Sequence, residues 1–239
     1  MKLALMQPYV FPYLGYFQLV HAVDLFVLYD DAAFRKQSWC NRNNLLGSHG
    51  AQRFTLPVRR PRMGQPICQV ELHDPLRYQQ RILRTIDVLY ARTRGFKEAR
   101  PVIEEAVSCQ SANLADYAVH SLSVLCRHLG IDTRLTRSSD QYRTLESKGQ
   151  QRVIEVCRAE TATVYINPEG GRHLYDPAAF RRAGMELKFL VHRPRPYPQS
   201  LPEFVPRLSI IDVMMWNGLA ETRRKLADYE FADSKPERY

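Results

Sequence analysis

Two short apolar runs near the start of the chain are separated by a loop and a segment with helical periodicity. Residues 3–6 and 25–29 are apolar segments of strand length, and residues 14–23 place their apolar side chains at the spacing of an amphipathic helix. The loop before this helix is rich in tyrosine and contains Pro8 and Pro12. We predict a strand–loop–helix–strand unit whose first loop lies at the carboxyl edge of an α/β sheet, where such folds bind ligands.

The remaining pattern predicts alternating strands and helices. Strands are expected at residues 54–58, 67–72, 131–136, 161–166 and 185–191. Helices are expected at residues 75–91, 101–107, 112–129, 148–158, 177–183 and 210–227. Residues 137–140 and 167–175 are interpreted as loops. The predicted fold class is α/β, with a mostly parallel, Rossmann-like sheet flanked by helices.

The chain is expected to form one domain. Residues 1–232 carry the alternating pattern without internal repeats, and residues 75–129 are helical enough to form an insertion or subdomain. Residues 233–239 are expected to form a flexible tail.

Composition points to a cytoplasmic protein. No apolar run approaches the ~18 residues that would cross a membrane, and the prolines that interrupt the apolar start disfavour a signal peptide. The five cysteines are odd in number and include no Cys-x-x-Cys pair, which disfavours a disulfide framework and a zinc site.

Charge suggests an anionic partner. The formal net charge is +9, most of it from arginine, and Arg77, Arg81 and Arg84 fall on one face of a predicted helix. An arginine face can bind the phosphates of a nucleotide-sugar, a carrier or RNA. The alternative is a solvated face that only tunes solubility. Neither a membrane nor DNA is expected as a partner.

Tyrosines and carboxylates gather at the predicted carboxyl edge. Tyr9, Tyr13 and Tyr16 can stack on a base or sugar, or can serve packing with one satisfied hydroxyl. Asp30 and Asp31 end the second strand, where a carboxylate can bind an amine, a ribose hydroxyl or Mg²⁺, act as a general base, or only cap a turn. Neighbouring strand residues face opposite ways, so only one of the two should point into a pocket, and we favour Asp30.

Further candidates lie in predicted loops. Lys36, Trp39, Asn41, Arg42 and Asn43 combine a cation, a stacking ring and amides, which suits recognition of phosphate or carboxylate; the alternative is a structured loop. We expect one pocket to be lined by Tyr9, Tyr13, Asp30, Asp31, Lys36 and Arg42.

Several groups remain open to more than one interpretation. The backbone N–H groups of Gly170 and Gly171 can approach an anion, or the pair can mark a turn. His173 and His192 lie in or near edge loops and can act as acid–base groups. Cys40 can carry an acyl group if a base lies nearby, or can be a small buried hydrophobe. The common nucleotide-binding, zinc-protease and serine-hydrolase motifs are absent from the sequence.

These motifs together resemble the WbqC-like family. The similarity rests on the run MQPYVFPYLGYFQLVHAVDLFVLYDD, on NRN at 41–43 and LPV at 56–58, on GG…LYD at 170–176, on YPQ at 197–199 and on LSIIDVMMWNG at 208–218. The sequence departs from the family pattern at Val10, which is often aromatic, and at Cys40, which is usually small or apolar.

The resemblance implies a bacterial protein of O-antigen or natural-product biosynthesis, with a suggested glycyl or other aminoacyl transferase role. We therefore expect a transferase that passes an aminoacyl or related acyl group to a sugar or small metabolite. Its donor is an aminoacyl-tRNA, an aminoacyl carrier protein or an aminoacyl-adenylate. Catalytic candidates are Asp30 or Asp31 as proton acceptor and Lys36, with Arg42, as donor anchor. Substrate-binding candidates are Gln7, Tyr9, Tyr13, Tyr16, Trp39, Asn41, Arg42, Asn43, Gly170, Gly171 and Tyr197.

A more distant resemblance gives the alternative. The run PYLGYFQL at 12–19 is similar to the opening of the HIGH-type nucleotidyltransferases, with Pro12 and Tyr16 at the histidine positions. It implies a nucleotide-dependent transferase or ligase that uses ATP and Mg²⁺; otherwise no cofactor and no metal is expected. A third interpretation is a non-catalytic module that binds a ligand or RNA.

Overall fold

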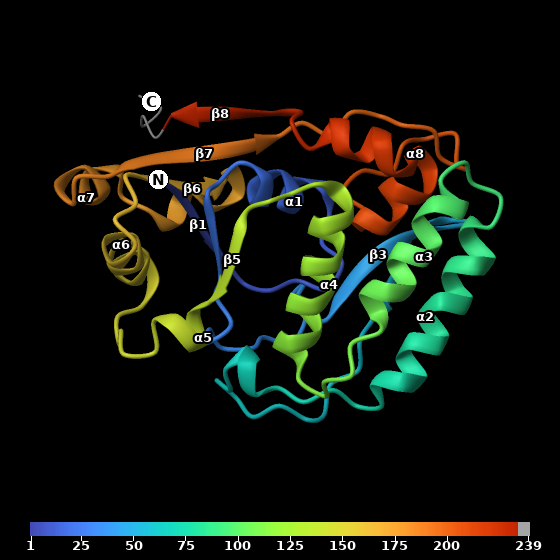
Figure 1. Cartoon of the computed structure of the whole chain (residues 1–239), viewed down its shortest axis with the longest axis horizontal. Helices are drawn as coiled ribbons and strands as arrows, with labels where there is room; N and C mark the ends of the chain where they lie inside the picture. Colours follow the sequence, from blue (N-terminus) through green and yellow to red (C-terminus); the bar gives the residue numbers. More distant parts are fainter. Residues whose placement is uncertain (234–239) are drawn as a thin grey trace.

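A six-stranded sheet forms the centre of the computed structural model, which describes residues 1–233 (Figure 1). The strand order is β5-β2-β1-β6-β7-β8, and every neighbouring pair is parallel except β7 and β8. The strands are β1 (Lys2–Met6), β2 (Leu25–Leu28), β5 (Arg134–Arg137), β6 (Val164–Pro168), β7 (Glu186–His192) and β8 (Tyr229–Asp233). The predicted α/β class with a mostly parallel sheet is confirmed.

The direction of the chain through this sheet reverses between β1 and β6. From β1 the chain adds β2 and then β5 on one side, and afterwards adds β6 and β7 on the other side. Two strands that are more than 150 residues apart in the sequence are therefore neighbours. In open α/β sheets the loops that leave such a pair diverge and open a crevice at the carboxyl ends of the strands.

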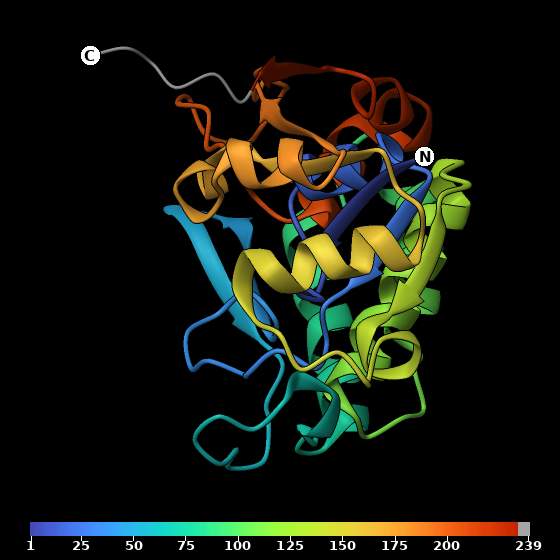
Figure 2. The same cartoon turned by 90° about the vertical axis from the view of Figure 1, so that its left-hand side faces the viewer.

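Both faces of the sheet are buried, which explains the continuous apolar strands. Ala4 and Phe26 face one hydrophobic cluster, with α1 (Leu14–His21), α2 (Pro75–Tyr90), α3 (Phe96–Val107), α4 (Leu114–Leu129) and α8 (Ile210–Lys225). Leu3 and Leu25 face a second cluster, with α6 (Gly149–Ala159) and α7 (Pro177–Arg182). Figure 2 shows α6 and α7 on the side toward the viewer, in front of the blue strands.

The boundaries of the long helices follow local sequence chemistry. Asn113 caps α4 by accepting hydrogen bonds from the N–H groups of Ala115 and Asp116, and Gly130 ends it with a left-handed φ of 69°. Asp74 caps α2 in the same way. The helices α2, α3 and α4 belong to the first cluster and not to a separate core.

The structure differs from the predicted elements at several points. Residues 67–72 are not a strand: Pro66 leads into the 3₁₀ turn η1 (Ile67–Gln69). A hairpin of β3 (Arg42–Gly47) and β4 (Gly50–Thr55) was not predicted, because its polar residues hide the strand pattern, and of the strand predicted at 54–58 only residues 54 and 55 belong to β4.

Two predicted loops contain helical turns, namely α5 (Ser138–Gln141) and η2 (Glu169–Leu174). The helix predicted at 101–107 begins five residues earlier, because Pro101 lies inside α3 and not at its start. Asp233, where the predicted tail starts, is the last residue of β8; residues 234–239 lie outside the described residues. Within residues 1–233, no helix is long and apolar enough to span a bilayer.

Candidate functional site

A cavity of about 330 Å³ lies at the crevice between β1 and β6, and we call it the switch-point pocket. Its walls come from the loop after β1, from the turn after β6, from the end of β7, and from the hairpin and the segment before α8. The lining side chains that matter below are Tyr9, Tyr13, Trp39, Gly170, His192 and Arg207. The pocket therefore lies where the sheet topology predicts a ligand site.

The tyrosine loop is held rigidly at this edge. Phe11 adopts a left-handed φ of 47°, and its carbonyl oxygen accepts hydrogen bonds from Asn43 Nδ2 at 2.7 Å and from Ser209 Oγ at 2.8 Å. Tyr16 is buried beneath the loop and donates to the carbonyl oxygen of Gln7 at 2.9 Å. Asn43 and Tyr16 thus support the loop.

Tyr9 and Tyr13 present their rings to the pocket. The Tyr9 ring lies 5.4 Å from the ring of Tyr16, and the Tyr13 ring meets the His192 imidazole edge-on at 5.5 Å. Burial raises the pKa of Tyr9 to about 12, so its hydroxyl is protonated at neutral pH and can donate a hydrogen bond.

His192 is fixed in one tautomer. Its Nδ1 lies 2.7 Å from Gln18 Oε1. The Gln18 amide nitrogen donates to the carbonyl oxygens of Lys225 and Asp228, at 2.8 and 2.9 Å, so Oε1 is the end that faces the histidine. His192 Nδ1 must then carry the proton, which leaves the Nε2 lone pair without a hydrogen-bond partner in residues 1–233.

The electrostatics of the pocket keep His192 neutral. Burial, and next the positive charge of Arg207, lower the pKa of His192 to about 4. Arg207 is exposed, has a left-handed φ of 58°, and forms no ion pair within the described residues. The pocket thus combines a neutral imidazole and a free guanidinium with aromatic walls.

A second cavity, of about 520 Å³, lies between residues 34–42 and residues 55–61, and we call it the basic pocket. Lys36, Arg42 and Arg60 line it, and no carboxylate does. The Arg42 guanidinium lies 5.9 Å from the centre of the Trp39 ring, which lines the switch-point pocket, and it donates to the carbonyl oxygen of Gln37. The Nε of Arg42 is buried without a partner. The two pockets therefore flank one Trp–Arg pair.

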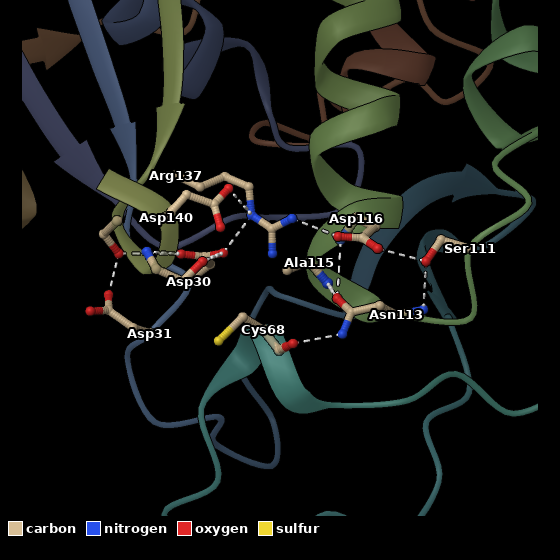
Figure 3. Close-up of polar contacts among 11 residues, drawn as sticks. Asp30, Asp31, Cys68, Ser111, Asn113, Ala115, Asp116, Arg137 and Asp140 are labelled. Atoms are coloured by element: carbon tan, nitrogen blue, oxygen red, sulfur yellow. Dashed lines mark hydrogen bonds and ion pairs between the residues drawn. The ribbon is translucent and has the colours of Figure 1, made fainter. Parts of the chain in front are cut away.

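Asp30 does not point into a pocket, and the prediction that it does is wrong. Its carboxylate is completely buried and accepts hydrogen bonds from Arg137 Nε at 2.7 Å, Ser139 Oγ at 2.7 Å and Ser139 N at 2.9 Å (Figure 3). Arg137 also donates to Asp116 at 2.7 Å, which ties the carboxyl ends of β2 and β5 to the start of α4. Asp30 is a structural anchor in this arrangement.

Asp30 and Asp31 lie in the turn after β2, which ends at Leu28, so the predicted strand alternation does not hold there, and Ser138 Oγ lies within hydrogen-bond distance of both carboxylates. Asp31 is therefore paired too. Its carboxylate accepts from Ser138 Oγ and forms a 2.6 Å ion pair with the buried Arg152. The expected single pocket does not form, because β2 lies beside β5 and the crevice opens on the opposite side of β1. Tyr9 and Tyr13 line the switch-point pocket, Lys36 and Arg42 line the basic pocket, and Asp30 and Asp31 line neither.

The other predicted residues fall into different surroundings. Asn41 lines the basic pocket and donates to the carbonyl oxygen of Leu56 at 2.9 Å. The Tyr197 hydroxyl donates a hydrogen bond to Asp212, and Tyr197 does not line the switch-point pocket. A Cβ on Gly171 would lie 2.2 Å from Asn167 Nδ2, so Gly171 serves close packing. Burial raises the pKa of Cys40 to about 11, and its thiol donates to Gln7 Oε1 over 3.8 Å, so it is a buried thiol and not a poised nucleophile.

The sequence indicated His192 as a possible acid–base group, but we did not include it among the catalytic candidates. Arg207 was not predicted at all. The signal for His192 was present, since a histidine at the end of an apolar strand lies at the carboxyl edge of a parallel sheet. Arg207 sits in a proline-rich connector, and no local pattern marks it. In residues 1–233, no group of three or more histidine, cysteine or carboxylate side chains gathers as a metal site.

Comparison with known proteins gives matches over most of the chain. The sequence profile of the WbqC-like protein family matches residues 7–224. The uncharacterized protein Rv1507c of Mycobacterium tuberculosis is 31% identical over 219 residues, which cover 89% of this chain and 92% of that protein. No solved structure matches the chain. The chain therefore belongs to the WbqC-like protein family.

Proposed function

We propose that this protein is a transferase that passes an acyl group, such as an aminoacyl group, to a hydroxyl or amine of a small, sugar-like acceptor in the switch-point pocket. The observation that carries the proposal is the unpartnered Nε2 of His192, held in its proton-accepting tautomer at the carboxyl edge of β7. A neutral, oriented imidazole in an aromatic-walled pocket is suited to general base catalysis.

In the proposed reaction the acceptor oxygen or nitrogen attacks the acyl carbonyl carbon while its proton moves to His192 Nε2. The bond between that carbon and the leaving group then breaks, and the protonated imidazole returns the proton to the leaving group. The pKa of His192, near 4, keeps the imidazole in its proton-accepting form at neutral pH. The same low pKa weakens the imidazole as a base and makes the imidazolium a stronger acid for the return step.

The surrounding side chains support binding of such an acceptor. The rings of Tyr9, Tyr13 and Trp39 offer flat surfaces on which a sugar ring can stack. The free Arg207 guanidinium at the same pocket can bind a carboxylate or phosphate of the acceptor. Lys36 and Arg42, beyond Trp39, can hold an anionic group of the donor and stabilise negative charge that develops on its leaving group.

The basic pocket also favours a second candidate, a ligase that uses ATP with Mg²⁺. Three cations without a carboxylate suit a phosphate chain, and a neighbouring aromatic pocket suits a base. Release of pyrophosphate that depends on added ATP distinguishes this ligase from a simple transferase. Ligand binding without turnover of any donor would favour a non-catalytic module.

Replacement of His192 by asparagine tests the proposal, because the shorter amide can still donate to Gln18 and lacks the Nε2 position. Transfer is followed by mass spectrometry from a glycyl thioester of N-acetylcysteamine to a panel of nucleotide-linked amino sugars. We expect His192→Asn to lower kcat by about 10²–10⁴-fold with little change in acceptor affinity.

His173→Asn is the matched control, since His173 is an exposed histidine that does not line the pocket. Equal rates for the two variants, or equal losses, would contradict the role of His192.

A further inference from the structure

A groove of about 840 Å³ lies between β4 of the hairpin and α2, and it shares no lining residue with the switch-point pocket. Arg77, Arg81 and Arg84 line it from one face of α2. The helical rise separates them by about 6 Å and about 4.5 Å along the axis, which is the scale of successive phosphates on a nucleic-acid strand. All three are exposed and none forms an ion pair within residues 1–233.

This groove continues into the basic pocket. Thr55 at the end of β4 lines both cavities, and its partner in the hairpin register is Arg42. Arg42 in turn lies over Trp39, which lines the switch-point pocket. One surface path therefore leads from α2 past the hairpin to the aromatic pocket.

The path is positive along its whole length. We call it the cation track and define it by Arg77, Arg81, Arg84, Arg60, Arg42 and Lys36. None of these six has an ion-pair partner in the part of the chain described here. The single carboxylate that lines the α2 groove or the basic pocket is Asp74, which accepts a hydrogen bond from the backbone N–H of Arg77 as the cap of α2. Glu169 lines the switch-point pocket at the end of the path.

We propose that the cation track binds a single-stranded RNA whose terminal nucleoside stacks on the exposed Trp39, at the junction of the basic pocket with the switch-point pocket that holds the acceptor. This inference rests on the proposed function and names its donor class: an acyl group esterified to the terminal ribose, which reaches His192 while the preceding phosphates lie on the track. One guanidinium group can donate two hydrogen bonds to the oxygens of a phosphate. Aromatic side chains can stack on any base, so they bind RNA whatever its base sequence.

An acidic protein fits the track less well. A stable protein interface buries an apolar core around its charged groups, whereas most side chains that line the α2 groove are polar or charged; the apolar ones are Pro57, Tyr78, Val88 and Leu89. The aromatic surface is instead at the end of the track, where a terminal base would lie. A row of cations that leads to aromatic rings is the arrangement expected of a site that binds the end of a single-stranded nucleic acid.

The test measures binding of a short, fluorescently labelled RNA by anisotropy at several salt concentrations. The triple variant Arg77→Gln, Arg81→Gln, Arg84→Gln should bind at least about tenfold more weakly and should lower the salt slope by about 2, since each lost phosphate contact removes about 0.7. RNA should also quench the fluorescence of Trp39, and Trp39→Phe should abolish that quenching.

The control triple Arg143→Gln, Arg158→Gln, Arg181→Gln removes the same charge from exposed, unpaired arginines on the α5–α7 side of the molecule. Equal losses in the two triples would show that only net charge matters, and equally tight binding of a polyglutamate peptide would show an acidic-protein surface; either result overturns the inference, as does the absence of RNA binding. Binding needs no turnover, so a transferase that ignores RNA would remove only this inference, and RNA binding without transfer would remove only the proposed function.

Discussion

The hydroxyl of Tyr197 donates a 2.6 Å hydrogen bond to Oδ2 of Asp212, a fully buried carboxylate with no cationic partner in residues 1–233. Tyr90 donates to the other oxygen at 2.8 Å and itself accepts from the N–H of Leu46. Burial raises the pKa of Asp212 despite these bonds. Two tyrosine hydroxyls thus stabilise the buried Asp212 carboxylate where a cation would otherwise be needed. Their hydrogen bonds connect α2, α8 and the hairpin.

Tyr197→Phe should lower the free energy of unfolding by about 1.5–3 kcal/mol, because it leaves a buried carboxylate short of one donor. Tyr78→Phe is the matched control, since the Tyr78 hydroxyl is buried without a partner and its loss should be neutral or stabilising. Chemical denaturation of the two variants checks the pair. Similar losses would contradict the assigned bond.

Asp30→Ala should destabilise the protein by about 3–5 kcal/mol, because it leaves the half-buried Arg137 and the donors of Ser139 without their acceptor. Asp140→Asn should cost less than about 0.5 kcal/mol, since Asp140 is 71% exposed and lies 3.7 Å from the same guanidinium. Urea titrations measure both. A stable Asp30→Ala protein would show that the anchor is dispensable.

The stability of the fold should fall between pH 6.5 and about pH 4 through His192. Its pKa is about 4 in the folded chain, against 6.5 ordinarily, so in this interval the unfolded chain binds the proton that the folded chain excludes. The loss is on the order of 1–2 kcal/mol once partial solvent exposure is discounted, and it stops below pH 4. His192→Asn should remove this component from melting curves recorded across the interval, and an unchanged pH dependence would contradict the low pKa.

Two adjacent glycines should respond differently to alanine. Gly171→Ala would drive a Cβ into the buried Asn167 amide, which donates to the carbonyl oxygen of Pro168, and should cost about 1–3 kcal/mol. Gly170 has open space at its Cβ position and a negative φ, so Gly170→Ala should fold like the native chain. Thermal unfolding of both variants checks this. A lower melting temperature for Gly171→Ala alone would indicate close packing, whereas a similar loss in both variants would indicate that the turn needs glycine at each position.

The sequence predicted the fold class, the tyrosine loop at the carboxyl edge and most helices, because these follow from local periodicity and caps. It could not predict strand order, and that order decides which loops meet. With β6 beside β1, the turn at Gly170 and the end of β7 join Tyr9 and Tyr13, whereas Asp30 ends beside β5. The hydrogen bonds of Tyr197 and Tyr90 to Asp212 likewise depend on tertiary packing, since Tyr90 and Asp212 are 122 residues apart in the sequence, and no local pattern predicts them.

The hydrogen bond from His192 to Gln18 has a consequence for synthesis on the ribosome. Gln18 is oriented by carbonyl groups of Lys225 and Asp228, so the tautomer of His192 depends on a segment that is translated after the residues that line the pocket. A nascent chain that has released residues 1–207 already contains every side chain that lines the pocket and still lacks the two carbonyls that orient the imidazole. Chemistry at this site would therefore begin only after residues 225–228 have emerged and their carbonyl groups have oriented Gln18.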